Sequence, residues 1–250
     1  MIRIILDCII VFLYLFVGII FLGLLWIIGL FNEKLKRKLA LRMVQGVFKL
    51  LLFTSGVKLK VSGRENIPDD TAVLYVSNHR SYFDILTGYT QVKGFCGFVS
   101  KIQMKKIPFL ASWMNLLYCL FLDRDDMRQS MKTIMAGIEQ LKSGISVWIC
   151  PEGTRNKQPD VTPTLEFKEG SLKMAEKAKV PVVPVAISGT WEIWERQFPK
   201  VKGGVVHMQF GKPFLVSDLS KEDKKRVGAY TRDIINDMLK DYPATPLNKR

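Results

Sequence analysis

The chain opens with a long apolar run. No charged residue occurs between Cys8 and Phe31, a stretch of 24 residues. As a helix it would be about 36 Å long, whereas the hydrocarbon core of a bilayer is roughly 30 Å thick. A soluble helix rarely needs apolar residues on every side for so many turns, and no small-residue cleavage site follows as in a signal peptide. The pattern predicts a helix that inserts into a membrane, either spanning it or half-immersed in it.

The next segment carries half of the net charge of the chain. Residues 33–60 hold eight basic side chains and one acidic side chain, which gives +7 of a total of +14. Basic residues beside a hydrophobic helix stay on the cytoplasmic side and attract anionic lipid head groups. We therefore expect the chain to sit at the cell membrane, with membrane lipids as partners and the bulk of the protein on the cytoplasmic face.

Apolar residues also recur at helical spacing inside this basic segment: Val44, Val47, Phe48, Leu51 and Leu52. They predict a helix with one apolar face. We favour a position in the membrane interface for it; the alternatives are packing on the first helix or docking on the rest of the protein. Accordingly, residues 1–56 are predicted to be membrane-anchoring helices and residues 57–250 a cytoplasmic domain.

From residue 57 onward, short apolar runs alternate with helical patterns. Helical spacing predicts helices at 83–91, Met127–Lys142 and Lys168–Lys179. A buried helix that enters a strand is predicted within Pro108–Leu122. The last helix is predicted to begin at the capping box Ser220 to Asp223, and its apolar stripe is Val227, Tyr230, Ile234 and Met238. The runs predict strands at Val57–Val61, Ala72–Ser77, Phe95–Ser100, Leu117–Leu122, Ile145–Ile149, Val182–Ser188 and Val205–Phe210. Apolar strands between helices are typical of a largely parallel central sheet flanked by helices. The predicted fold class is therefore α/β, preceded by the N-terminal membrane-embedded helical segment.

Composition narrows the possibilities further. With 48% apolar residues, the chain is too hydrophobic for a disordered protein, and 18 glycines and four cysteines exclude collagen-like and disulfide-scaffold proteins. The cysteines form no CxxC pair, so we expect them to be reduced. No cluster with the spacing of metal ligands occurs, so we expect no metal.

Two histidines limit the candidates for a general base near neutral pH. His207 lies within a predicted strand with no acid nearby and is interpreted as a strand side chain. His79 directly follows a predicted strand, where α/β sheets place their sites, and Asp84 follows five residues later. The two can meet if His79 lies in the turn and Asp84 in the first turn of the next helix, with Ser81 as a cap. An aspartate on one ring nitrogen would fix the tautomer and raise the basicity of the other nitrogen.

Further polar residues follow other predicted strands. Glu152, Gly153, Thr154 and Arg155 come after the strand at Ile145–Ile149, where glycine permits a tight turn and arginine offers a planar fork for phosphate. Lys101 and Arg124 close two more strands. Basic residues gathered beside one candidate base suggest a pocket for a phosphorylated, hydroxyl-bearing substrate. The loop Asn156–Thr164 could form part of its entrance.

The motifs that contain these residues closely resemble those of the glycerolipid acyltransferases, and in particular those of the 1-acyl-glycerol-3-phosphate acyltransferases. The NHxxxxD motif of that family is met by residues 78–84, its EGTR motif by residues 152–155, and its proline-bearing strand by residues 180–187. The GxxFIxR motif is met only in part, because Tyr118 stands where glycine is usual and Leu122 where isoleucine is usual, while Arg124 is kept. Because this glycine is missing, the motif alone does not fix the course of the backbone at residue 118.

The resemblance implies a reaction. His79 would take the proton from the 2-hydroxyl of lysophosphatidate, which would attack the thioester of acyl-CoA or acyl-carrier protein, and Asp84 would orient the imidazole. Lys101, Arg124 and Arg155 would hold the phosphate, with Asn78, Glu152, Gly153 and Thr154 also at the substrate site. No cofactor is implied.

Three alternatives stay open from the sequence. Cys150 adjoins the EGTR segment and could carry an acyl group covalently, although a cysteine at the end of an apolar strand is usually inert. The acceptor could be glycerol 3-phosphate or another lysophospholipid. The charge of +14 could instead serve a non-catalytic, membrane-anchored binder of polyanions, but no nucleic-acid-binding module is recognisable and we expect no nucleic-acid partner.

Overall fold

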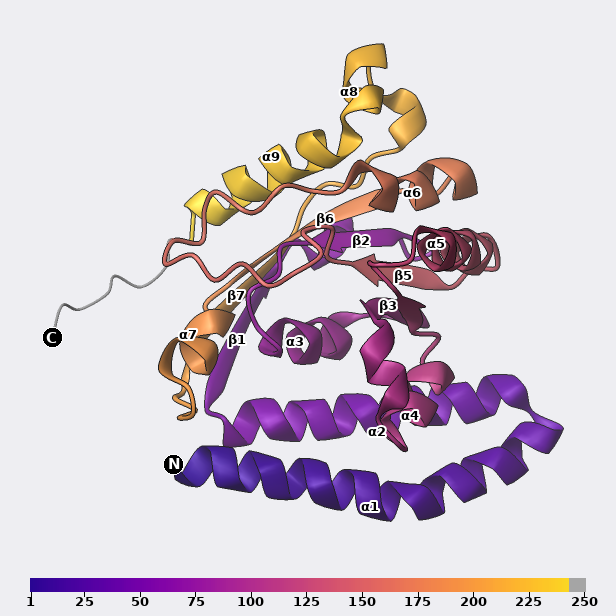
Figure 1. Cartoon of the computed structure of the whole chain (residues 1–250), viewed down its shortest axis with the longest axis vertical. Helices are drawn as coiled ribbons and strands as arrows, with labels where there is room; N and C mark the ends of the chain where they lie inside the picture. The colour runs from indigo at the N-terminus through magenta and orange to yellow at the C-terminus, as the bar shows by residue number, and fades with distance from the viewer. Residues whose placement is uncertain (243–250) are drawn as a thin grey trace, which may run out of the picture.

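A seven-stranded sheet forms the centre of the computed structural model, which describes residues 1–242 (Figure 1). Its order is β1-β7-β6-β2-β5-β3-β4, and every neighbouring pair is parallel except β6 and β7. The predicted largely parallel sheet is therefore confirmed. The strands are β1 Val57–Ser62, β2 Leu74–Ser77, β3 Cys96–Lys101, β4 Leu120–Leu122, β5 Ser146–Ile149, β6 Val182–Ser188 and β7 Gly204–Phe210.

Helices cover both faces of the sheet, because its central strands are apolar on both sides. Tyr75 belongs to a hydrophobic cluster on the face toward α2, α3 and α4, whereas Leu74 and Val76 belong to a second cluster on the face toward α5, α6 and α9 (Figure 1). The α-helices beyond residue 56 are α3 Phe83–Gln91, α4 Leu110–Leu116, α5 Met127–Lys142, α6 Lys173–Ala178, α7 Thr190–Ile193, α8 Lys221–Lys225 and α9 Val227–Lys240, and the 3-10 helices are η1 Arg64–Asn66, η2 Ile102–Lys106, η3 Glu169–Ser171, η4 Glu195–Gln197 and η5 Val216–Asp218.

Three predicted helices differ in extent from the observed ones. Residues 108–122 form the short helix α4, which buries Trp113, and the three-residue strand β4. Residues 168–179 form the 3-10 turn η3 followed by α6. The helix predicted to begin at Ser220 is divided at Arg226 into α8 and α9.

The division of the last helix has a tertiary cause. The hydroxyl of Ser220 accepts the amide of Asp223, as the capping box predicts, but a second helix then starts where the carboxylate of Glu169 accepts the amides of Gly228 and Ala229. A carboxylate is favourable at a helix N-terminus, and sequence spacing within residues 220–240 does not reveal one that comes from residue 169. The buried stripe of α9 is consequently Val227, Thr231, Ile235 and Leu239, with the predicted Tyr230, Ile234 and Met238 beside it.

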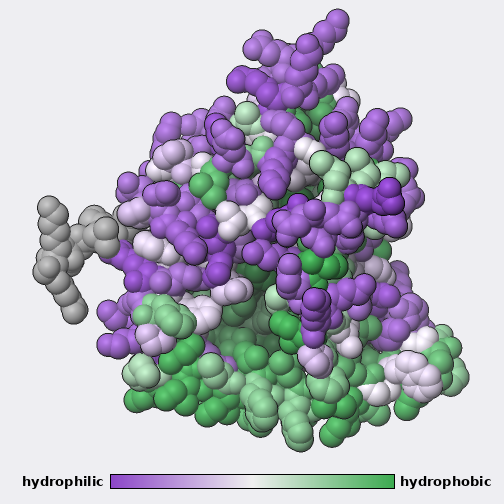
Figure 2. All heavy atoms as spheres, viewed as in Figure 1, coloured by the Kyte–Doolittle hydropathy of each residue, from purple (hydrophilic) through white to green (hydrophobic). Residues whose placement is uncertain are grey.

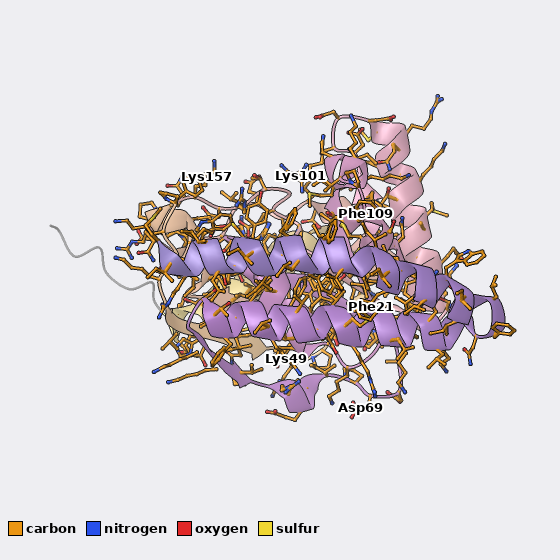
Figure 3. The ribbon with its side chains drawn as sticks, turned by 90° about the horizontal axis from the view of Figure 1, so that it is seen from below. Phe21, Lys49, Asp69, Lys101, Phe109 and Lys157 are labelled. Atoms are coloured by element: carbon orange, nitrogen blue, oxygen red, sulfur yellow. The ribbon has the colours of Figure 1, made fainter. Side chains whose placement is uncertain are left out.

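Two long helices lie side by side beneath the sheet (Figures 1 and 3): α1 Ile2–Phe31 and α2 Glu33–Thr54. Only Asn32 separates them; its side chain accepts the amide of Leu35 and caps α2. The prediction that the apolar face of α2 lies in the membrane interface is wrong. Val44, Leu51 and Leu52 are buried, and Gln45 donates to the carbonyl of Tyr89 in α3 at 2.9 Å. Thus α2 packs between α1 and the sheet domain, as the alternatives allowed.

The outer apolar surface is provided by α1. Of its residues only Asp7, Gly18 and Leu25 are buried, and the lower part of the molecule is a continuous hydrophobic band (Figure 2). By length and composition α1 could cross a membrane. The division of function between residues 1–56 and 57–250 stays a prediction.

A polar clasp joins the start of α1 to the end of α2. One carboxylate oxygen of Asp7 accepts the hydroxyl of Thr54 at 2.5 Å and the other accepts that of Ser55 at 2.8 Å, while Arg3 donates to the carbonyl of Ser55 at 3.3 Å. Asp7 and Ser55 are both buried. The clasp therefore fixes the N-terminus of α1 beside the first strand of the sheet.

Replacing Asp7 by Ala is expected to destabilise the protein by about 1–3 kcal/mol, because the buried Ser55 hydroxyl loses its acceptor. The melting temperature in detergent micelles should fall, and it should fall less for Asp7→Asn, which keeps one acceptor oxygen. Asp70→Ala, at an exposed position, is the control. Equal melting temperatures for wild type and Asp7→Ala would show that the clasp contributes nothing.

Candidate active site

The carboxyl ends of four adjacent parallel strands meet at one edge of the sheet. β2 leads to His79, β5 to Glu152, β3 ends at Lys101 and β4 is followed by Arg124. The order β2-β5-β3-β4 brings these ends together, as the strand-end interpretation requires. The parallel neighbour of β2 on its other side, β6, delivers Thr190 to the same edge.

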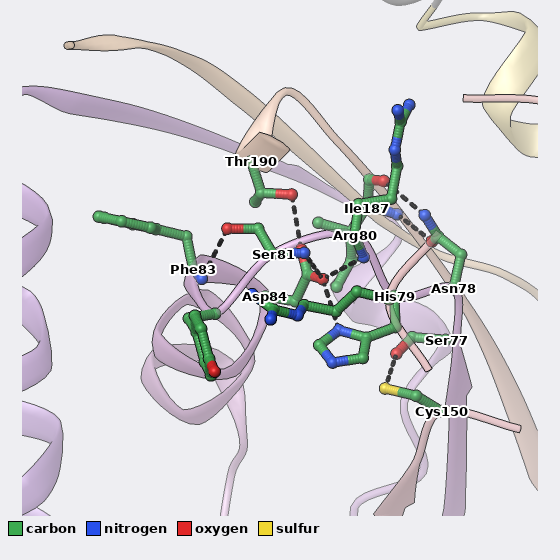
Figure 4. Close-up of polar contacts among 12 residues, drawn as sticks. Ser77, Asn78, His79, Arg80, Ser81, Phe83, Asp84, Cys150, Ile187 and Thr190 are labelled. Carbon is green, nitrogen blue, oxygen red and sulfur yellow. Dashed lines mark hydrogen bonds and ion pairs between the residues drawn. The ribbon is translucent and has the colours of Figure 1, made fainter. Parts of the chain in front are cut away.

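His79 and Asp84 are in direct contact (Figure 4). The Nδ1 atom of His79 lies 2.8 Å from Oδ2 of Asp84, with His79 in the turn after β2 and Asp84 in the first turn of α3. The hydroxyl of Ser81 accepts the amide of Phe83 and so caps the start of α3. The His79 side chain is 19% exposed, while that of Asp84 is 3% exposed. One ring nitrogen therefore faces a buried carboxylate, which leaves Nε2 for a reacting group.

The position of Asp84 is fixed by more than the histidine. Its Oδ2 also accepts the amides of Arg80 at 2.7 Å and Ser81 at 2.8 Å, and its Oδ1 accepts the hydroxyl of Thr190 at 2.6 Å. Thr190 is fully buried and is a site residue that the sequence reasoning missed. The same rule that found His79 would have found it, because Thr190 closely follows the apolar strand β6.

Asn78 does not face an open site. Its side-chain amide donates to the carbonyl of Ile187 and accepts the amide of Ile187, both at 2.8 Å, and the residue is 1% exposed. The expected substrate contact is thus replaced by a structural role, because both hydrogen-bonding groups of the amide are engaged with β6. Asn78 locks the end of β2, and with it His79, to the neighbouring strand.

Glu152 likewise holds backbone rather than substrate or arginine. Its two carboxylate oxygens accept the amide of His79 at 2.6 Å and that of Leu165 at 3.0 Å. The carbonyl of His79 accepts the amide of Asn156 at 2.7 Å, so the loop from 152 to 156 is bonded to both sides of the histidine backbone. Burial raises the pKa of Glu152 to about 7.

Arg155 is held by a partner that no motif contains. Its Nη1 donates to Oε1 of Glu195 at 3.0 Å, and its guanidinium lies 4.0 Å from the centroid of the Tyr82 ring. The same Glu195 oxygen accepts the amide of Tyr82 at 2.9 Å. Glu195, in η4, therefore joins the arginine of the EGTR segment to the loop that carries His79.

The other predicted site residues lie more openly. Lys101, Arg124 and Thr154 are exposed at the strand-end edge, and Gly153 has a φ of 72°, a conformation that favours glycine. Tyr118, where the related motif has glycine, adopts a φ of 61°. The backbone at Tyr118 therefore adopts a left-handed conformation that favours glycine, and Arg124 follows β4.

Arg80 connects the histidine turn to the loop proposed as an entrance. Its guanidinium donates to the carbonyls of Gln158 and Pro159 and lies 4.8 Å from the centroid of the Trp191 ring. The Arg80 residue is 4% exposed. The segment 156–164 is thus anchored at Gln158 and Pro159 to the turn beside His79.

Cys150 and His207 have settings unlike those of reactive groups. The Sγ of Cys150 lies 3.4 Å from the Ser77 hydroxyl, and burial raises the pKa of this thiol to about 12, so it stays protonated at neutral pH. A covalent acyl carrier at Cys150 is therefore disfavoured. His207 lies in β7 with its ring stacked on Tyr242, as a strand side chain. Within residues 1–242 no group of three or more His, Cys, Asp or Glu is placed to hold a metal ion; a reaction without metal or cofactor stays a prediction.

Comparison with known proteins relates this geometry to one family. The family model described as "Acyltransferase" matches residues 58–188. A 1-acyl-sn-glycerol-3-phosphate acyltransferase of Saccharomyces cerevisiae is 30% identical over 233 residues, covering 92% of this chain and 74% of that protein. One from Borreliella burgdorferi is 30% identical over 201 residues, covering 79% and 78%. The crystal structure of the 1-acyl-sn-glycerophosphate (LPA) acyltransferase from Thermotoga maritima superimposes with a TM-score of 0.79 at 25% identity, covering 96% of this chain and 94% of that one.

The raised pKa of Glu152 predicts a pH dependence of stability. In the unfolded chain this carboxyl ionises near its ordinary pKa of 4.5, whereas in the folded protein its pKa is about 7 and it keeps its proton to higher pH. The folded state therefore binds more protons in this window, and stability falls as the pH rises through it. Glu152→Gln lacks this ionisation. Between about pH 5 and about pH 7.5 the melting temperature of the wild type should fall relative to that of Glu152→Gln; a constant difference would contradict the assignment.

Proposed function

The chain belongs to the acyltransferase family, and we propose that it transfers a fatty acyl group from an acyl thioester to the 2-hydroxyl of 1-acyl-glycerol 3-phosphate, giving phosphatidic acid. The names of the similar proteins support this acceptor. The observation that carries the proposal is the contact of 2.8 Å between Nδ1 of His79 and Oδ2 of Asp84, at an edge of the sheet where cationic side chains gather.

His79 is the general base in this proposal. With Nδ1–H donating to Asp84, the lone pair on Nε2 accepts the proton of the 2-hydroxyl while that oxygen attacks the thioester carbonyl carbon. The tetrahedral intermediate collapses by breaking the carbon–sulfur bond, and the thiolate leaves and takes the proton from the imidazolium. Asp84 stabilises the imidazolium in between. General-base catalysis of this kind contributes about 10²–10⁴ in rate.

The phosphate of the acceptor would meet basic side chains at the same edge. Lys101, Arg124 and Arg155 are the residues proposed to bind it. Glu195 accepts from Nη1 of Arg155 at 3.0 Å, and a guanidinium carries five N–H donors. Arg155 can thus remain on Glu195 and still donate to phosphate, while Gly153 and the exposed Thr154 line the adjoining turn. Asn78 and Glu152 position His79 without touching substrate.

The hydrophobic band supports catalysis at a membrane surface, with α1 half-immersed rather than spanning. Near its N-terminus, Arg3 and Asp7 bind residues at the end of α2 next to β1. Further along, Tyr14 packs on Trp113 of α4 at a ring distance of 5.1 Å, and past its C-terminus Arg37 donates to the carbonyl of Asn115. A helix attached to the same domain along its length lies along the membrane surface, so one leaflet would receive its outer face. We propose the cytoplasmic face of the cell membrane, from the basic residues of α2.

Two features of the substrates stay within the proposal. The acyl donor is a thioester of coenzyme A or of acyl-carrier protein, and both present the same carbonyl to the attacking oxygen. Glycerol 3-phosphate is the alternative acceptor, since it carries the same phosphate and a 2-hydroxyl. A polyanion-binding protein without catalysis would not need a histidine bonded to a buried carboxylate.

The proposal is tested with purified protein in mixed micelles. Wild type should convert 1-acyl-glycerol 3-phosphate and an acyl thioester to phosphatidic acid, and His79→Ala should reduce kcat by at least about 10²-fold, because the proton acceptor is lost. His207→Ala is the matched control and should retain full activity. Equal rates for wild type and His79→Ala would refute the proposed mechanism, and faster acylation of glycerol 3-phosphate would refute the proposed acceptor.

Thr190 is expected to act as a positioning residue for Asp84. Thr190→Val removes the hydroxyl that Asp84 Oδ1 accepts and leaves a buried carboxylate oxygen without a partner. We expect kcat to fall about tenfold or more, with little change in the KM for the acceptor, and Thr190→Ser to restore it. A Thr190→Val enzyme with the kcat of the wild type would show that Asp84 needs no support from β6.

A further inference from the structure

Two cationic side chains approach the same face of Gly153. A Cβ atom at this glycine would lie 3.3 Å from Cε and 3.5 Å from Nζ of Lys168, and 3.9 Å from Cζ of Arg124. Arg124 comes from the segment after β4, and Lys168 from the segment just before η3. Lys168 belongs to the segment 167–170 that precedes the proline-bearing strand of the family resemblance, but it was not among the residues predicted to bind substrate.

Neither cation forms an ion pair in the part of the chain that the structure describes, although the charge of Asp125 acts on Arg124 from a greater distance. Among residues 1–242 no carboxylate lies within 4.0 Å of the Lys168 ammonium or the Arg124 guanidinium, whereas Arg155 is paired with Glu195. Like charges held close together without a counter-ion repel each other. Such an arrangement is favourable when an anion lies between them, and phosphate is an anion that both arginine and lysine bind well.

The backbone holds this pair beside His79. The amide of Lys168 donates to the carbonyl of Pro151 at 3.1 Å, directly before Glu152. Glu152 and Asn156 in turn bind the amide and the carbonyl of His79, so Gly153 lies in the loop that brackets the histidine. Gly153 also leaves room for the two side chains, since any larger residue would place a Cβ against Lys168.

We infer that Lys168 and Arg124 form a two-cation site over Gly153 that binds the phosphate of the acyl acceptor. The inference rests on the proposed function and adds Lys168 as a binding residue of that reaction. The 2-oxygen of 1-acyl-glycerol 3-phosphate and its phosphorus atom are four bonds apart. An acceptor whose hydroxyl is at His79 therefore places its phosphate close to the loop that brackets His79. The phosphates of a coenzyme A or carrier-protein donor are the other source of the same chemistry.

The test is steady-state kinetics of the full-length protein in mixed micelles. Lys168→Met keeps most of the length of the side chain and removes its charge. We expect the KM for 1-acyl-glycerol 3-phosphate to rise about tenfold or more, because a charge-assisted hydrogen bond is lost, while the KM for the acyl donor stays the same. Lys168→Arg should retain most of the affinity. Lys173→Met, at an exposed position on α6, is the matched control and should behave as wild type.

A second measurement separates binding from folding. Glycerol 2-phosphate, a phosphate monoester without a free 2-hydroxyl, should inhibit the wild type competitively against the acceptor, with an inhibition constant that rises severalfold in Lys168→Met, while the melting temperature is unchanged. An unchanged acceptor KM in Lys168→Met, or a rise confined to the donor KM, would overturn the inference. A wild type that does not acylate 1-acyl-glycerol 3-phosphate would instead overturn the proposed function.

Discussion

The site depends on a single buried carboxylate. Asp84 is 2% exposed and accepts hydrogen bonds from His79, Arg80, Ser81 and Thr190. A charge buried to this extent is costly unless it is fully hydrogen-bonded. Because its partners come from the turn after β2 and from the segment after β6, satisfying Asp84 also fixes these two parts of the chain relative to each other. The orientation of the His79 ring is therefore fixed by contacts between separate segments of the chain, and not only by the rotamer preference of the residue.

Around this carboxylate, polar groups fall into two sets. Asn78, Glu152 and Arg80 hold backbone, and each is buried. Lys101, Arg124 and Lys168 are exposed at the same edge of the sheet. The first set makes the histidine turn rigid, and the second supplies positive charge where a phosphate would arrive. A rigid base beside exposed cationic side chains, in a protein whose outer helix α1 is apolar and largely exposed, suits an acceptor that is lipid at one end and phosphate at the other.

The sequence predicted the elements that local patterns determine. The parallel sheet and the bounds of α3, α5 and β6 are confirmed, because apolar periodicity carries them. His79 and Asp84 lie in contact, as their strand-end position allowed, while their catalytic role stays a proposal. The sequence did not predict contacts between distant segments. Glu195 and Glu169 act on residues far away along the chain, so no local spacing marks them. Thr190 also acts on a distant residue, but its position just after β6 follows the same strand-end pattern as His79. For the same reason it misjudged the apolar face of α2, since a face that meets lipid and a face that meets α3 have the same pattern.

We propose that Asp84 fixes the His79 imidazole with its proton on Nδ1, which leaves Nε2 as the base. Nitrogen-15 NMR of histidine-labelled protein tests it directly, because the chain has two histidines and His207→Gln leaves one. At alkaline pH, where the imidazole is neutral, we expect a protonated Nδ1 and an unprotonated Nε2. Asp84→Asn should abolish this preference. A wild-type spectrum with the proton on Nε2 would show that Asp84 does not set the tautomer and that Nε2 is not the base.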